Sequence, residues 1–174
     1  MAGLRKGHCY TTIKRAYTRK SKFKKKGYIK ATPNSKIIRF HMGDTTKKYD
    51  RKLELKTKAA IQIRHNALES VRMLVNRRLH EALGLDYHLM VKPYPHHALR
   101  ENKMLTGAGA DRMQTGMQRA FGKVIGLAAQ LKKNQTIMSV EVNEKNLDIA
   151  MKALKLAPQR LPGKCTITVS KIAK

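Results

Sequence analysis

The sequence has few acidic residues and few cysteines, and each shortage excludes a class of protein. Its 174 residues contain 11 Asp and Glu against 38 Lys and Arg, which gives a net charge of +27. So few carboxylates leave little scope for a paired-carboxylate active site. Cys9 and Cys165 are too few for a disulfide scaffold, so we expect free thiols in a reducing, intracellular protein.

Several motifs are also missing. No apolar run approaches the ~18 residues that a membrane-spanning helix needs, and no signal peptide is visible. The zinc spacings CxxC and HExxH are absent, and the adjacent His96 and His97 would point to opposite faces of a strand. The nucleotide-binding patterns GxxxxGK[ST] and GxGxxG are absent too. We therefore expect no metal, no cofactor and no catalytic residue.

What the sequence does have is concentrated positive charge. Residues 1–43 contain 13 Lys and Arg and no acid. Self-repulsion at this charge favours an anionic partner, and nucleic acid gains most because neutralised phosphates release counterions. The 41% hydrophobic content supports one core, so we predict a single domain over residues 1–174 with a basic arm at 1–34.

Aromatic residues between the charges of the arm favour RNA, because rings stack on bases while Lys and Arg pair with phosphates. The alternative is a disordered, solvated tail. The interleaved aromatic residues are Tyr10, Tyr17, Phe23 and Tyr28. The residues that we predict to bind RNA are Arg5, Lys6, Tyr10, Lys14, Arg15, Tyr17, Arg19, Lys20, Lys22, Lys24, Lys25, Lys26, Arg100 and Lys103.

Hydrophobic periodicity predicts an α+β fold. Helical spacing of Leu68, Val71, Val75, Leu79 and Ala82 predicts a helix over 66–83, with Asn66 and Glu69 as a capping box and Gly84 as its end. A second helix follows Asn143 and ends at Pro158. The predicted strands cover 35–42, 49–56, 59–63, 87–95, 121–131, 136–143 and 165–172. This order predicts two helices packed on a mainly antiparallel sheet.

The segment 103–120 is predicted to be an extended, basic, glycine-rich loop, which is longer than most connections in a compact domain. Gly107 and Gly109 would let the backbone approach a phosphate. Arg112 and Arg119 could pair with phosphates or stack on bases. Met113 and Met117 lie four residues apart, so they could instead form a small hydrophobic face.

Six stretches occur in the order typical of one family. They are CY (9–10), AYTRK (16–20), FHMG (40–43), NALESVRM (66–73), VKPYPHHALRENKM (91–104) and GAGADRMQTGMQRAFGK (107–123). Across nearly its whole length the chain resembles the large-subunit ribosomal proteins called "ten-e" in archaea and eukaryotes and "sixteen" in bacteria. The GADRMQTGM and AFGK segments are the most specific part of this resemblance.

The resemblance implies a hammerhead-like fold on large-subunit rRNA, near the A-site tRNA elbow and the 5S rRNA region, in the cytoplasmic ribosome. It implies contacts with neighbouring ribosomal proteins, no homo-oligomer, late entry into the subunit, help in tRNA positioning and no catalysis. In this family the long loop reaches toward the tRNA sites and the peptidyl transferase centre. The matching residues are Met104, Leu105, Thr106, Gly107, Ala108, Gly109, Ala110, Asp111, Arg112, Met113, Gln114, Thr115, Gly116 and Arg119.

Two other functions compete with this interpretation. An RNA-modifying or RNA-processing enzyme could use the same basic surface, but it would need an acid, a nucleophile or a cofactor motif. A DNA-compacting or anionic-membrane protein would also be basic. The membrane version would need a basic helix with a broad apolar face, whereas both predicted helices have core-like stripes.

Overall fold

A computed structural model of the chain describes residues 5–18, 29, 31–103, 105–109, 113 and 122–172. The elements follow in the order α1 (His8–Thr11), β1 (His41–Gly43), β2 (Arg51–Thr57), β3 (Ile61–Arg64), α2 (His65–Leu83), β4 (His88–Val91), β5 (His97–Glu101), β6 (Lys123–Leu131), β7 (Thr136–Val142), η2 (Glu144–Asn146), α4 (Leu147–Lys155), η3 (Ala157–Arg160) and β8 (Cys165–Lys171). This is the α+β fold that the periodicity predicts.

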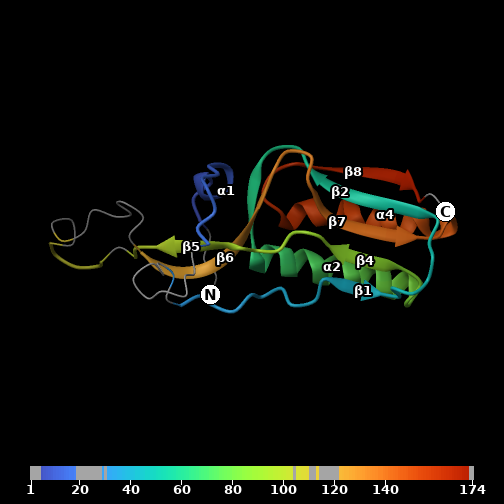
Figure 1. Cartoon of the computed structure of the whole chain (residues 1–174), viewed down its shortest axis with the longest axis horizontal. Coiled ribbons are helices and arrows are strands. Elements are labelled where there is room, and N and C mark those ends of the chain that lie inside the picture. Colours follow the sequence, from blue (N-terminus) through green and yellow to red (C-terminus); the bar gives the residue numbers. More distant parts are fainter. Residues whose placement is uncertain are drawn as a thin grey trace.

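The strands form two antiparallel sheets. A five-stranded sheet has the order β1-β4-β7-β2-β8, and a three-stranded sheet has the order β3-β6-β5. Figure 1 shows an elongated molecule in which the five-stranded sheet lies at one end with α2 and α4, while β5 and β6 run toward the other end. The α1 helix lies beside the three-stranded sheet.

The two sheets are joined by strand pairs that continue from one sheet into the other. The consecutive strands β2 and β3 face the consecutive strands β7 and β6, so that Lys56 is opposite Thr136 and Ile61 is opposite Leu131. At the bend, Thr57 N–H donates to the Gln135 carbonyl at 3.1 Å, and Asn134 N–H donates to the Thr57 carbonyl at 2.9 Å. The chain thus passes from one sheet to the other without losing its backbone partners.

The core lies between the two longer helices and the five-stranded sheet, and it extends to Ile61 and Ile63 of β3 and Leu131 of β6. Leu68, Val71, Val75 and Leu79 of α2 are fully buried, as the helical spacing predicts. They pack in one cluster with sheet residues such as Leu53. Burying each such side chain contributes about 1.5–3 kcal/mol to the free energy of transfer from water.

Two details of α2 differ from the expectation. Ala82 is exposed, not buried. The helix begins at His65 directly after β3, so Asn66 lies within the helix, where its Oδ1 accepts from the Ala67 N–H at 3.0 Å, and it is not the N-cap. Glu69 instead pairs with Arg72, whose Nε donates to Glu69 Oε2 at 2.8 Å. The predicted capping box is therefore wrong, whereas the predicted end at Gly84 is correct.

The strand predicted over 35–42 is mostly extended chain without a ladder, since only 41–43 belong to β1. Before β1, side chains form hydrogen bonds with this backbone. Ser35 Oγ donates to the Ile37 carbonyl at 2.9 Å, and Lys36 N–H donates to His65 Nδ1 at 3.3 Å. Ile37 is buried and Ile38 is exposed. These side chains satisfy part of the hydrogen-bonding capacity of the backbone, so this stretch is extended without a strand partner.

The strand predicted over 87–95 contains only β4, and a second strand that was not predicted, β5, follows it in the other sheet. Pro93 and Pro95 lack the N–H groups that a ladder needs, so β4 ends at Val91 and β5 begins at His97. The periodicity did not reveal β5, which ends at Glu101, just before the loop predicted over 103–120. The sequence HALRE has little β propensity, so pairing with β6 decides its conformation.

Candidate nucleic-acid interface

Residues 5–18 are attached to the three-stranded sheet by backbone hydrogen bonds. Ala98 N–H donates to the Tyr17 carbonyl at 3.0 Å, and Tyr17 N–H donates to His97 Nδ1 at 2.7 Å. A backbone N–H can only donate, so the proton of the neutral His97 ring lies on Nε2. Burial, helped by the charge of Arg100, lowers the pKa of His97 and favours this neutral form.

Two further contacts join the segment to β5. Arg5 forms a bidentate ion pair with Glu101, in which one guanidinium nitrogen lies 3.1 Å from Glu101 Oε2. The hydrogen bond from Arg5 lowers the pKa of the Glu101 carboxyl group. The Arg100 guanidinium lies 3.8 Å from the centroid of the Tyr17 ring, which is a cation–π contact. The segment is therefore held in register along the strand.

Two glutamine side chains connect the three-stranded sheet to α1. Gln62 of β3 donates from Nε2 to the Cys9 carbonyl at 3.0 Å, and Gln130 of β6 donates from Nε2 to Gln62 Oε1 at 3.0 Å. These glutamines are opposite each other in the β3–β6 register. Gln62 is buried, so its bonds to Cys9 and Gln130 reduce the cost of burying its amide.

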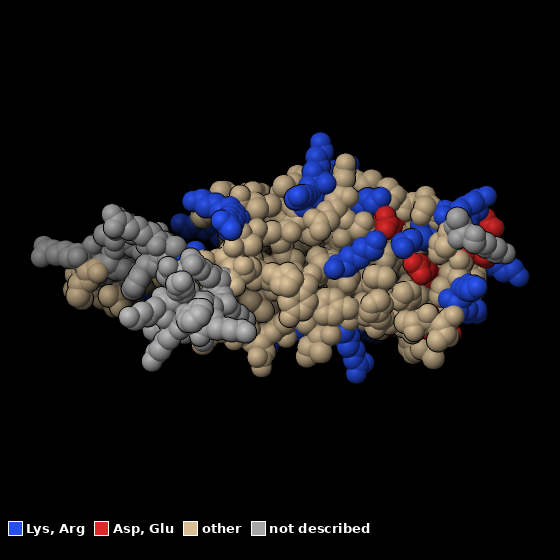
Figure 2. Space-filling model, in the orientation of Figure 1, with Lys and Arg blue, Asp and Glu red and all other residues tan. Residues whose placement is uncertain are grey.

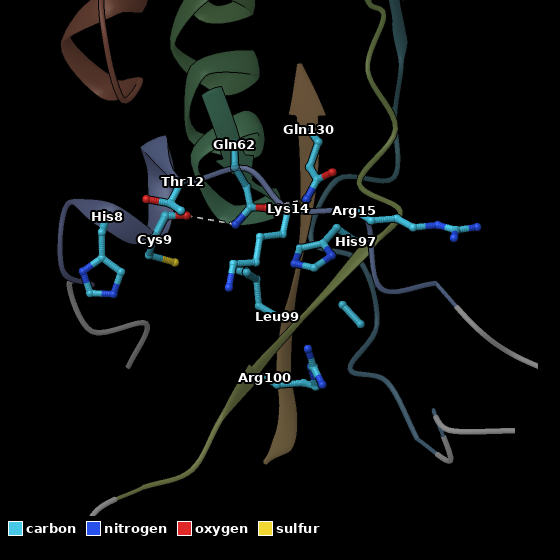
Figure 3. A pocket seen from close by; sticks show the side chains of 11 residues that line it. His8, Cys9, Thr12, Lys14, Arg15, Gln62, His97, Leu99, Arg100 and Gln130 are labelled. Atoms are coloured by element: carbon cyan, nitrogen blue, oxygen red, sulfur yellow. Dashed lines mark hydrogen bonds between the residues drawn. The ribbon is translucent and has the colours of Figure 1, made fainter. Parts of the chain in front are cut away.

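A pocket of about 350 Å³ lies between this segment and the sheet, and Figure 3 shows its lining. Lys14 extends among the lining side chains in this view, whereas Arg15 points away from them. No carboxylate lines the pocket among the described residues. The lining residues are His8, Cys9, Thr12, Lys14, Arg15, Gln62, His97, Ala98, Leu99, Arg100 and Gln130.

This end of the molecule is strongly cationic. Within residues 5–18 and strands β3, β5 and β6, the single acid is Glu101, which Arg5 pairs with. The cations there are Arg5, Lys6, Lys14, Arg15, Arg64, Arg100 and Lys123. On the face shown in Figure 2, the acidic atoms are confined to the opposite end, which carries the five-stranded sheet. A surface of this composition attracts phosphates.

In the five-stranded sheet, by contrast, both acids are paired with basic side chains. Glu54 accepts from Lys92 at 3.0 Å and also pairs with Lys56. Glu141 pairs with Lys52 at 3.0 Å and with His88 at 3.1 Å. Burial alone would raise the pKa of Glu141, but the hydrogen bonds from Lys52 and His88 outweigh burial and lower it.

The structure brings several predicted RNA-binding residues together. Lys6, Lys14 and Arg15 are exposed, and Tyr10 is half-buried. Tyr17 and Arg100 contact each other, and Lys103 follows β5. Other predicted RNA-binding residues lie outside the described residues: Arg19, Lys20, Lys22, Lys24, Lys25 and Lys26, together with the aromatic residues Phe23 and Tyr28.

Part of the long loop is described. Leu105 is 53% exposed and Met113 is 74% exposed. Gly107 and Gly109 have φ values of +142° and +82°, which disfavour any other residue. In Figure 1 the loop lies beyond β5, at the end of the molecule far from α4. The remaining loop positions named above lie outside the described residues: Met104, Ala110, Asp111, Arg112, Gln114, Thr115, Gly116, Met117 and Arg119.

Sequence reasoning missed Gln62, His97 and Gln130 as parts of this interface. Isolated glutamines carry no signal, and their pairing depends on the register between β3 and β6. For His97 the sequence favoured polar surface or an RNA contact over a metal ligand, but it gave no sign of the contact with Tyr17. In the described part of the chain, no three His, Cys, Asp or Glu residues are grouped to hold a metal ion. No described helix is both long and apolar enough to cross a membrane.

Comparison with known proteins gives a consistent result. The family model described as ribosomal protein L16p/L10e matches residues 14–168. "Large ribosomal subunit protein uL16" of Metallosphaera sedula is 45% identical over 170 residues, which cover 95% of this chain and 94% of that protein. The proteins of the same name from Methanococcus maripaludis and Staphylothermus marinus are 41% and 44% identical, and they cover 97% and 91% of this chain and 95% and 89% of their own lengths. The chain therefore belongs to the ribosomal protein L16p/L10e family.

Proposed function

We propose that this chain is a structural protein of the large ribosomal subunit, in cytoplasmic ribosomes, and that it binds large-subunit rRNA through residues 5–18 and the three-stranded sheet. The observation that carries the proposal is the cationic surface at this end, where Glu101 is the single acid in residues 5–18 and strands β3, β5 and β6 and is already paired with Arg5. Family membership supports the ribosomal role, since its relatives are named as large-subunit proteins and not as enzymes.

The fixed position of residues 5–18 supports binding in a defined orientation. The bonds from Tyr17 and Ala98 hold the segment in register with β5, so the cations Lys6, Lys14 and Arg15 belong to one surface with Arg100. Preorganised cations lose less conformational entropy on binding than cations on a free chain. Each phosphate contact also releases counterions, which makes the binding salt-dependent.

The long loop carries the second part of the proposal. It extends toward the tRNA sites and the peptidyl transferase centre, where it aids tRNA positioning. The chain joins late in subunit assembly, near the 5S rRNA region and beside neighbouring ribosomal proteins, as one copy. The exposed Leu105 and Met113 support a loop that contacts a partner, because large apolar side chains in a loop gain from being covered. The family resemblance supplies the identity of that partner.

Two triple variants test the rRNA interface. Lys6, Lys14 and Arg15 are replaced by Gln in one, and the exposed Lys133, Lys145 and Lys152 are replaced by Gln in the other. Both lose the same charge, but the first should lower the slope of log affinity against log salt by about 2 to 3, since each lost phosphate contact contributes roughly 0.7–0.9. Equal effects of both variants on binding to large-subunit rRNA would contradict a localised interface.

A deletion of residues 105–112 tests the loop. The deleted protein should still co-sediment with large subunits after a high-salt wash, because the deletion spares the three-stranded sheet. Subunits that carry it should bind A-site tRNA more weakly or mature more slowly. Normal tRNA binding and normal maturation would exclude the proposed role of the loop, and they would leave the rRNA interface unaffected.

A further inference from the structure

The pocket between residues 5–18 and the three-stranded sheet is more specific than a phosphate-binding surface requires. Its volume of about 350 Å³ falls within the roughly 300–1,000 Å³ of small-ligand sites. One part of its lining is apolar, with Ala98 and Leu99, and another part carries the cations Lys14 and Arg100. A single phosphate group would leave the apolar part unused. The lining instead suits a ligand with both a flat, polar-edged ring and an anion.

The amide pair in the lining has spare hydrogen-bonding capacity. Gln62 and Gln130 each use one N–H, toward Cys9 and Gln62 respectively, and Gln62 Oε1 uses one lone pair. A carboxamide offers two N–H groups and two lone pairs, so the pair keeps both donors and acceptors. Neutral His97 adds a donor at Nε2, since Nδ1 already accepts from Tyr17. Base edges display donors and acceptors of this kind.

We propose that this pocket receives one unstacked nucleotide of single-stranded or bulged RNA. The base packs against the part of the lining at Leu99, its edge faces the Gln62–Gln130 pair, and Lys14 and Arg100 contact the flanking phosphates. This inference rests on the proposed RNA binding and adds a site to it. A base within a continuous duplex is stacked and paired, so its entry into the pocket requires the free energy of unstacking and unpairing.

The two cysteines provide a direct test in the full-length protein. Cys9 lines the pocket, and Cys165 begins β8 of the other sheet. Both are free thiols. Alkylation by N-ethylmaleimide is followed at each thiol by mass spectrometry. The probes are an RNA hairpin with one bulged adenosine, the same hairpin fully paired, and AMP.

The bulged hairpin should slow the alkylation of Cys9 by about tenfold relative to the paired hairpin at equal concentration, which corresponds to about 1.4 kcal/mol of preference. Cys165 should react at the same rate with both hairpins. AMP should protect Cys9 only at millimolar concentration, because it lacks the flanking phosphates that Lys14 and Arg100 would contact.

Two variants assign the effect to the pocket. Gln130→Leu removes the amide that faces the base, and it should abolish the preference for the bulge. Lys14→Gln should weaken binding of the bulged hairpin more than Lys133→Gln, which removes the same charge from an exposed position. Circular dichroism checks that each variant is folded.

Each outcome decides one question. Absence of binding to any RNA would overturn the proposed function itself. Binding with equal protection of Cys9 by both hairpins, or an unchanged bulge preference in the Gln130→Leu variant, would overturn the pocket inference alone. Protection of Cys9 by micromolar AMP without any preference for the bulge would identify a free nucleotide as the ligand and would also overturn it.

Discussion

The two ends of this molecule are stabilised by different interactions. The end with the five-stranded sheet has a continuous hydrophobic core beneath two helices, and its acids Glu54 and Glu141 each pair with two basic side chains. The end with the three-stranded sheet is held by polar contacts between residues 5–18 and β5, and it has little acid to offset its cations. In residues 5–18 and strands β3, β5 and β6, positive charge exceeds negative charge, which favours a phosphate-bearing partner.

The largest expected effect comes from a substitution that creates a cavity in the core at the five-stranded end. Leu53 is fully buried in the main cluster, so Leu53→Ala should lower the free energy of unfolding by about 3–5 kcal/mol. Leu99 of β5 is also buried but lies outside that cluster, so Leu99→Ala should cost about 2 kcal/mol or less. Urea denaturation measures both. Equal losses would show that the two ends share one core.

Glycines at the two ends offer a second comparison. Gly43 has φ +82°, and an added Cβ would lie 1.9 Å from the Tyr87 carbonyl oxygen. Gly107 in the loop has φ +142° with nothing within 4 Å of an added Cβ. Gly43→Ala should therefore cost about 3 kcal/mol, from strain and displaced backbone, while Gly107→Ala should cost about 1 kcal/mol. Thermal unfolding of both variants would test this, and a cheaper Gly43 variant would contradict it.

Detaching residues 5–18 should have a moderate and local effect. His97→Ala removes the acceptor for the Tyr17 N–H, which costs about 1 kcal/mol. Amide exchange should accelerate at Tyr17 and Ala98 and stay unchanged in α2. Faster exchange throughout α2 would mean that the segment and the core unfold together.

Acid should weaken the five-stranded end through its carboxylates. The hydrogen bonds from Lys92 and Lys56 outweigh burial and lower the pKa of Glu54, just as those from Lys52 and His88 lower the pKa of Glu141. A group whose pKa is lower in the folded state binds fewer protons there than in the unfolded state. Its stabilisation is therefore present above the ordinary Glu range and is lost as the pH falls through the lowered pKa.

Glu141→Gln should accordingly lower stability at neutral pH by less than about 1 kcal/mol, because the pair is partly exposed. It should also flatten the loss of stability between about pH 5 and pH 3. Chemical denaturation at several pH values measures this. An unchanged pH profile would show that Glu141 does not contribute to the acid sensitivity of this end.

Local patterns predicted much of the fold. Helical spacing located α2 to within one residue, and alternation located β2, β7 and β8 closely. Prediction was poorest where tertiary contacts replaced local preference. The 35–40 backbone has side-chain partners instead of a ladder, and β5 depends on β6 and on residues 5–18. Neither effect is local in sequence, so no periodicity could reveal it.

The candidate site was predictable only in part. Charge and aromatic residues indicated RNA binding by the arm, and Arg5, Lys14, Tyr17 and Arg100 do come together on one surface. The pocket that Lys14 and Arg100 share with Gln62 and Gln130 was not predictable. Its lining comes from four segments that are far apart along the chain, and it exists because the β3–β6 register places the glutamines opposite each other.

The sequence by itself determined the class of partner, the α+β composition and the family, because charge, periodicity and motifs are properties of neighbouring residues. Tertiary structure alone decided the division into two sheets, the docking of residues 5–18 on β5 and the pocket beside Cys9. These features depend on which strands pair and in which register. That choice is made by the free energy of the whole folded chain and not by any local segment.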